Sequence, residues 1–268
     1  MIHKRKRKEI YMFQEEVGLV GNASKAKVSL LKNNPLGYFL ASIFGGMYIG
    51  FGILLIFTAG GLLNAAGSPA TKIVMGACFG VALSLVVIAG AELFTGNNFV
   101  MTVGLFRKEV TLKDTLALWV VCWVGNLLGS VIIGALYHVT GLANGPVGEF
   151  IAKTAEAKMA VSFLPLLTRG ILCNILVCIA VWCGFKCKSE AGKLIMIFWC
   201  LFVFITVGFE HSIANMTLLT VGLFDPYTFA VSLGGFVYNL LVVTLGNMIG
   251  GIFFVAVPYC VIAKQRKK

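Results

Sequence analysis

One histidine stands apart from the other ionisable residues of this chain. His211 follows Glu210 in GFEHSIANM (208–216), deep within a long apolar stretch, whereas His3 lies in the N-terminal tail and His138 near the end of another apolar stretch. A charged group at membrane depth is costly, and imidazole exchanges protons near neutral pH. His211 is therefore a candidate proton donor to a solute. A buried histidine satisfied by backbone or asparagine groups is the alternative.

A sequence repeat places polar interruptions at equivalent positions of two apolar stretches. ELFTGNNFVMTVGLF at 92–106 returns 118 positions later as EHSIANMTLLTVGLF at 210–224. Each copy carries helix-weakening residues where a membrane helix should be most hydrophobic. Duplicated, interrupted membrane helices are typical of a solute site between two repeats. We therefore predict helix breaks near Thr95 and His211, both facing an interior pathway rather than lipid.

Acidic and amide residues recur within this repeat. Glu92 matches Glu210, and Asn97 matches Asn215. We interpret all four as structural braces, with the two carboxylates accepting backbone N–H groups that the breaks set free. A pair of catalytic acids is the alternative interpretation.

The composition predicts an all-α membrane protein. The 268 residues are 59% hydrophobic and 12% charged, which argues against a water-soluble fold. Six nearly uncharged stretches each exceed the roughly 20 residues that cross a bilayer as a helix. We predict one transmembrane helix in each stretch, with the second and fifth helices broken. The stretches are 36–63, 73–106, 115–139, 159–185, 194–224 and 226–263.

A second repeated pattern extends the internal symmetry to neighbouring spans. The pattern GNxxG at 125–129 recurs at 246–250, so the third and sixth helices look equivalent. Three spans in each unit make the two units cross the membrane in opposite senses. We therefore predict a 3+3 inverted repeat.

The net charge of +11 is concentrated near the ends and in alternate connections of the chain. The positive-inside rule then places both termini in the cytoplasm of a multi-pass protein of the cytoplasmic (inner) cell membrane. We expect a basic tail and an amphipathic interfacial helix in residues 1–33, a six-helix transmembrane domain in 34–263, and a basic tail in 264–268. Membrane lipid, not nucleic acid, is the expected partner of the basic ends.

The sequence lacks the motifs of a membrane-embedded enzyme. It contains no HExxH, GxSxG or Cys/His cluster, and the eight cysteines form no CxxC pair. We expect no metal, no cofactor and no enzymatic activity, and we interpret the cysteines as small packing residues.

Several of these segments together resemble the formate/nitrite transporter family of bacterial membrane channels. They are AELFTGN (91–97), GILCNILVCIAVW (170–182) and GFEHSIANM (208–216), with Lys158 upstream of the second. The resemblance implies an aquaporin-like protomer without the Asn-Pro-Ala pair, and a homopentamer in which each protomer holds its own pore. It also implies passage of small monovalent weak-acid anions such as formate, nitrite or hydrosulfide, and its overall character leans toward the hydrosulfide branch.

The resemblance also implies roles for individual residues. His211 and Thr95 would lie at the pore centre, one from each broken helix, while Lys158 and Asn174 would border the outer vestibule and the pore. The apolar constrictions would be formed by Phe79, Leu83 and Leu93 on the cytoplasmic side and by Phe94, Val177 and Phe204 on the outer side.

These roles combine into one hypothesis for transport. Lys158 would concentrate anions outside, and His211 would protonate the anion between two apolar rings that exclude a bare charge. The alternative is an aquaporin-like channel for neutral solutes such as water, glycerol or ammonia. The absence of Asn-Pro-Ala and the presence of His211 and Lys158 argue against that alternative.

Overall fold

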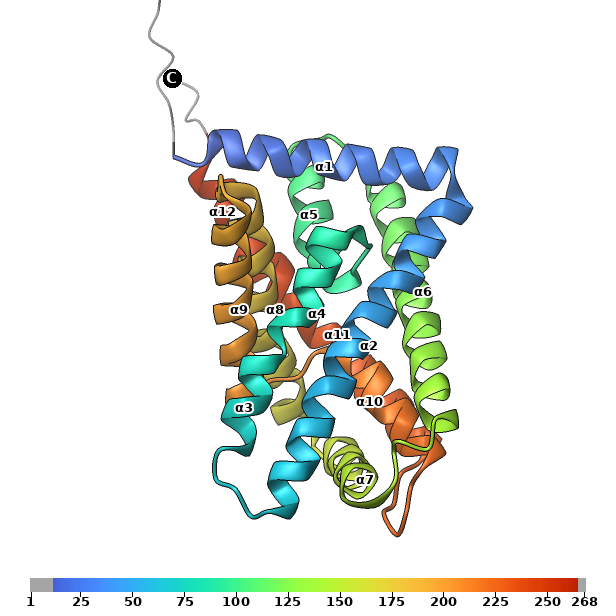
Figure 1. Cartoon of the computed structure of the whole chain (residues 1–268). Coiled ribbons are helices and arrows are strands. Elements are labelled where there is room, and N and C mark those ends of the chain that lie inside the picture. The colour runs from blue at the N-terminus through green and yellow to red at the C-terminus, as the bar shows by residue number, and fades with distance from the viewer. Residues whose placement is uncertain (1–11, 265–268) are drawn as a thin grey trace, which may run out of the picture.

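A computed structural model describes residues 12–264, and this range consists of helices and their connections (Figure 1). Most of the basic residues predicted for the two tails lie outside the described residues. Within that range, six segments are long and apolar enough to cross a membrane, which confirms the predicted number of spans. They are Pro35–Ala65, Thr71–Gly90, Leu112–Val139, Phe163–Lys186, Glu190–Val207 and Leu233–Ile262.

The spans are divided further by local interruptions. In chain order the elements are α1 (Gln14–Asn33), α2 (Pro35–Ala65), α3 (Thr71–Cys78), α4 (Gly80–Ser84), the π-helical η1 (Leu85–Gly90), α5 (Phe94–Phe106), α6 (Leu112–Val139), α7 (Gly145–Met159), α8 (Phe163–Lys186), α9 (Glu190–Val207), α10 (Ser212–Phe224), α11 (Leu233–Gly251), the π-helical η2 (Ile252–Ala256) and α12 (Val257–Ile262). Both ends of the described chain lie at the same end of the bundle, as an even number of crossings requires (Figure 1).

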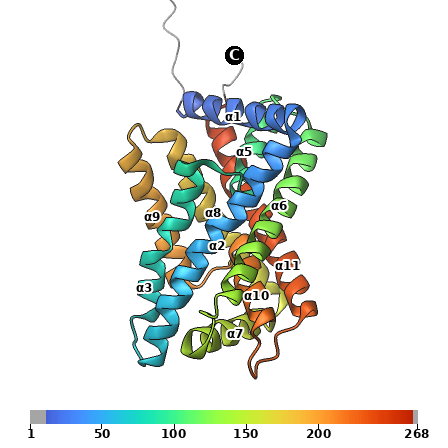
Figure 2. The ribbon, with the colours of Figure 1, turned by 45° about the vertical axis from the view of Figure 1, so that its right-hand side comes forward.

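Helix α1 lies across one end of the bundle, transverse to the spans (Figures 1 and 2). Its apolar side buries Val17 and Val20 against the α5 residues Phe99 and Val103. Asn34 then accepts a hydrogen bond from the backbone N–H of Gly37 (2.9 Å), and Pro35 occupies the first turn of α2. This cap and this proline start a new helix directly after α1.

Glycines bring the backbones of two helix pairs into direct contact. A Cβ atom added to Gly129 of α6 would meet the carbonyl oxygen of Ile43 in α2, and one added to Gly250 of α11 would meet that of Ile171 in α8. Apolar burial drives little association in lipid, so close backbone packing has to hold such helices together. The two GNxxG patterns therefore form equivalent helix contacts, α2 with α6 and α8 with α11.

The two interruptions have nearly the same backbone conformation. Gly90 (φ 86°) ends η1 and Gly208 (φ 94°) follows α9, and each is in the left-handed region that favours glycine. Three residues further on, Leu93 (φ −116°, ψ 121°) and His211 (φ −111°, ψ 117°) are extended and precede α5 and α10. The chain is thus non-helical just before Thr95 and at His211.

The structure differs from the predicted fourth and sixth spans, each of which begins later than predicted. Residues 145–159 form a separate helix, α7, which lies at the end of the bundle opposite α1 (Figure 1). The fourth span accordingly begins at Phe163, not at Met159, and the sixth begins at Leu233 after a loop, not at Pro226. Hydropathy extended these predicted spans into apolar residues that belong to the connections.

Candidate functional site

His211 and Thr95 meet at the centre of the bundle. The Nε2 atom of His211 and the Oγ1 atom of Thr95 are 3.0 Å apart, and both side chains are buried. His211 is also the N-cap of α10, because its Nδ1 atom accepts a hydrogen bond from the backbone N–H of Ala214 (3.1 Å). A ring that accepts at Nδ1 carries its proton at Nε2 when neutral, and so it donates to Thr95. The hydroxyl hydrogen of Thr95 is then available to another acceptor.

Helices α5 and α10, which follow the two interruptions, are the two half-helices of the fold. The residue of α5 that corresponds to His211 of α10 is apolar. Leu93 is the N-cap of α5 and has nearly the same φ and ψ as His211, but its side chain makes no cap. One interruption therefore presents a polar ring to the interior, and the other presents an aliphatic side chain.

Two cavities approach this centre from opposite ends of the bundle. The α1-side cavity has a volume of about 490 Å³, and the α7-side cavity a volume of about 250 Å³. Lining residues of the α1-side cavity include Lys27, Leu83, Glu92, Leu93, Asn97 and Lys193. Those of the α7-side cavity include Lys72, Lys158, Phe204, His211 and Asn215. Leu93 and His211 thus face different cavities.

One aromatic ring stacks directly on His211, and a second packs behind the first. The ring of Phe204 stacks on His211 (centroids 5.9 Å apart), and the ring of Phe79 packs edge-on against Phe204 (5.6 Å). The family resemblance groups Phe79 with Leu83 and Leu93. All three belong to one buried cluster, and the ring of Phe79, one turn before Leu83, packs against Phe204.

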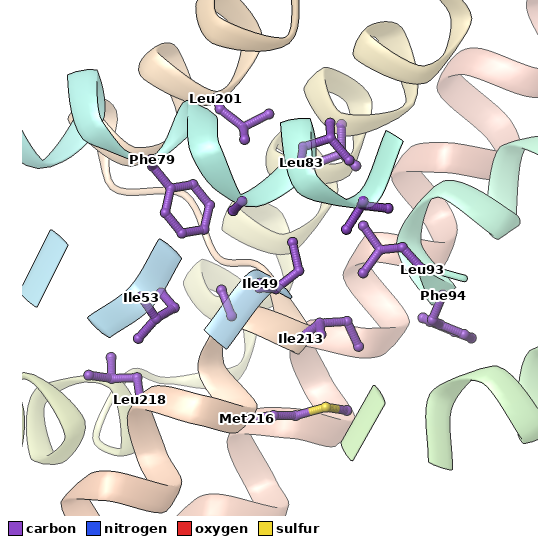
Figure 3. Close-up of a cluster of buried hydrophobic side chains, with 14 of the residues drawn as sticks. Ile49, Ile53, Phe79, Leu83, Leu93, Phe94, Leu201, Ile213, Met216 and Leu218 are labelled. Carbon is purple, nitrogen blue, oxygen red and sulfur yellow. The ribbon is translucent and has the colours of Figure 1, made fainter. Parts of the chain in front are cut away.

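The other two residues of the predicted outer ring, Phe94 and Val177, belong to the same buried cluster as Phe204 but line neither of the two cavities. Phe94 lines a separate apolar cavity with Trp119 and Trp123 of α6, and Figure 3 shows it at the opposite margin of the buried cluster from Phe79. Val177 is buried in the core and lines neither of the two cavities. The rotation of each helix about its own axis decides this, and hydropathy does not report it.

Glu92 is the centre of a charged cluster beside the first interruption. Lys27 of α1 donates to its Oε1 atom (2.6 Å), and Asn97 of α5 donates to its Oε2 atom (2.8 Å). The hydroxyl group of Tyr38 in α2 lies 3.2 Å from the same Oε2 atom. The cluster therefore ties α1, α2 and α5 to the interruption.

Glu210 has equivalent partners beside the second interruption. Lys158 of α7 and Asn215 of α10 each donate to its Oε2 atom (2.7 Å). Asn215 also donates to the side chain of Asn239 (2.8 Å), which donates in turn to the backbone carbonyl of Lys158 (3.0 Å). Lys158 does border the α7-side cavity, but its charge is matched by a carboxylate.

Comparison with known proteins gives the family of the chain. The sequence model described as formate/nitrite transporter matches residues 15–261. The nitrite transporter NirC of Escherichia coli (strain K12) is 43% identical over 239 residues, which cover 88% of each chain. The chain belongs to the formate/nitrite transporter family.

Two solved structures have the same fold as this protein. A structure titled FNT family ion channel has a TM-score of 0.88 and 39% sequence identity, and the match covers 92% of this chain and 98% of that one. A structure titled pentameric formate channel with formate bound has a TM-score of 0.73 and 28% identity, covering 86% and 98%. The six-span helical fold is therefore shared with ion channels.

Two asparagines outside the predicted site form hydrogen bonds to the backbone at the starts of α5 and α10. Asn126 accepts the backbone N–H of Phe94 (2.9 Å) and donates to the backbone carbonyl of the preceding glutamate (2.8 Å). Asn247 does the same for Ser212 (2.9 Å) and the glutamate of the second copy (2.9 Å). These asparagines, not the carboxylates, accept the freed N–H groups. The GNxxG repeat was the signal for them.

Asn174 of α8 binds the backbone of Thr95. Its side-chain amide donates to the backbone carbonyl groups of Thr95 (3.3 Å) and Asn247 (2.7 Å) and to the side chain of Asn98 (3.2 Å). It is fully buried and lines neither cavity. The residue thus connects α8 directly to α5, and through Asn247 of α11 to the start of α10.

Proposed function

We propose that this protein is a membrane channel or transporter for small monovalent weak-acid anions, with nitrite and formate as the first candidates. The observation that carries the proposal is the Thr95–His211 hydrogen bond, which lies where the two cavities approach each other. The relatives named for nitrite and formate support these two anions. Hydrosulfide, toward which the overall family resemblance leaned, has no such support among these relatives.

The solute crosses the apolar passage as the neutral acid. A bare anion among apolar side chains is strongly penalised, and loss of water raises the pKa of the corresponding acid. The solute therefore takes up a proton as it is desolvated. Leu83 and Leu93 form the apolar boundary on the α1 side, and Phe204, against which Phe79 packs, forms it on the α7 side.

His211 acts as a hydrogen-bond donor through Thr95 in this proposal, which revises our hypothesis that it hands over its own proton. A second ring proton would occupy Nδ1, which accepts the backbone N–H of Ala214. The first turn of α10 would then lose its cap. The neutral ring instead keeps Thr95 oriented with its hydroxyl hydrogen available to the solute.

Orientation and assembly complete the proposal. Lys25, Lys27 and Lys32 of α1 place the α1 side of the bundle in the cytoplasm under the positive-inside rule, so the α7-side cavity opens outward. The membrane is the cytoplasmic membrane, and both termini are cytoplasmic. The pentameric relative supports a homopentamer with one pathway in each protomer.

An anion panel in proteoliposomes tests this function. Nitrite, formate and hydrosulfide are compared with glycerol at two pH values, and empty liposomes correct for free diffusion of the neutral acids. We expect protein-dependent flux of at least one of the three anions, faster at the lower pH because more acid forms. Glycerol uptake without protein-dependent anion flux would instead establish the neutral-solute channel.

A further inference from the structure

Two lysines at the cavity walls have no carboxylate partner. Lys72 lines the α7-side cavity, and Lys193 lines the α1-side cavity. Neither forms an ion pair with any residue in the range 12–264. Lys72 is exposed and Lys193 is half-buried. Each cavity therefore holds one uncompensated positive charge.

The other lysine of each cavity differs in this respect. Lys27 is bound to Glu92 (2.6 Å) and Lys158 to Glu210 (2.7 Å). A lysine and a glutamate in contact present little net charge to an approaching ion. The paired lysines therefore attract an anion less than their position suggests, and their main contribution is to hold the interruptions in place.

The unpaired lysines do not stabilise the helices that carry them. Lys72 is the second residue of α3, and Lys193 is the fourth residue of α9. The start of a helix carries the positive end of the helix dipole, where a cation is unfavourable. The cap of α9 is supplied by Ser189, whose side chain accepts the backbone N–H of Gly192 (3.1 Å). A positive charge kept at an unfavourable position, facing a cavity, points to a role outside folding.

The two positions correspond in the fold. Helices α3 and α9 each form the first part of an interrupted span, and they begin at opposite ends of the bundle (Figures 1 and 2). We propose that Lys72 and Lys193 are the anion-recruiting residues of the two mouths, one on each side of the membrane. Each raises the local concentration of the anion before it is desolvated. This inference rests on the proposed function.

Charge removal at each mouth tests the proposal. Lys72→Gln and Lys193→Gln are compared with two control variants, Lys153→Gln and Lys188→Gln. The two control lysines are exposed, form no ion pair within residues 12–264, and line neither cavity. Initial nitrite and formate flux is measured in proteoliposomes at low anion concentration. The salt concentrations are about 10 mM and about 0.5 M, since screening acts over about 30 Å and a few Å respectively.

A unit charge about 7 Å from the anion in water changes its local concentration about threefold. We expect each cavity variant to lower flux about threefold at low salt, and Lys72→Glu to lower it further. At high salt all variants should approach the wild-type flux, and the two controls should match it throughout. Cavity variants that match their controls at low salt would overturn the inference while wild-type flux remained. Absence of flux in the wild-type protein would instead overturn the proposed function.

Discussion

Thr95 and His211 come from different half-helices, yet one hydrogen bond joins them. Thr95→Val keeps the volume of the side chain and removes the hydroxyl group that we expect to bind the solute. The lost hydrogen bond to the neutral solute is worth about 0.5–1.5 kcal/mol, so anion flux should fall about two- to tenfold. Thr95→Ser retains a hydroxyl group and is the matched control. Flux into proteoliposomes of equal protein content measures both, and a wild-type rate for Thr95→Val would contradict this role.

The variant His211→Asn separates two roles of His211, which are capping of α10 and titration of its ring. Asparagine is a strong N-cap residue and can accept the Ala214 N–H, but it does not titrate. If the solute takes up its proton from water, the flux of His211→Asn should keep the wild-type pH dependence at a lower rate. A flux that no longer varies with pH would show that the ring itself delivers the proton.

At the scale of the elements, the two interruptions depend on glycines with positive φ. A Cβ atom added to Gly90 or Gly208 would meet no atom within 4 Å, so alanine there tests backbone strain alone. We expect Gly208→Ala and Gly90→Ala each to destabilise the protein by about 1–2 kcal/mol. Gly234→Ala is the control, because that glycine is helical and its Cβ would also lie in open space. Thermal unfolding in detergent measures the three variants, and equal midpoints would contradict the strain argument.

At the scale of the whole molecule, charged contacts fasten α1 across the bundle. Glu109, in the connection between α5 and α6, pairs with Lys25 of α1, and this hydrogen bond holds the pKa of the Glu109 carboxyl below its usual value. A carboxyl whose pKa is lower in the folded state stabilises the fold at neutral pH and loses that effect as the pH falls through the folded pKa. Docking of α1 should therefore weaken below about pH 4.5.

Hydrogen-exchange protection of the α1 amides, corrected for the intrinsic pH dependence of exchange, measures this docking. Protection should be lower at pH 4 than at pH 7 in the wild-type protein, and Glu109→Gln should show a smaller change. The variant should not become independent of pH, because Lys27–Glu92 and Lys32–Asp114 also fasten α1. Identical pH profiles for the variant and the wild-type protein would assign the effect to those other pairs.

The number of spans and the positions of the two interruptions could be predicted from the sequence alone. Long apolar stretches and glycine, asparagine and threonine at membrane depth are local properties, and each has a direct physical consequence in lipid. The repeat also indicated which residues are equivalent, and Glu92 and Glu210 do occupy equivalent clusters. Helix α7 was missed because four of its fifteen residues are charged, so the search for long apolar stretches passed over it.

Which groups meet became clear only in the folded molecule. There Lys158 pairs with Glu210, Asn126 and Asn247 accept the freed N–H groups, and Phe94 lines an apolar cavity with Trp119 and Trp123. These outcomes depend on the rotation of each helix about its axis and on contacts between residues far apart in the chain. Hydropathy and spacing carry no information about either, because both describe a helix without its neighbours.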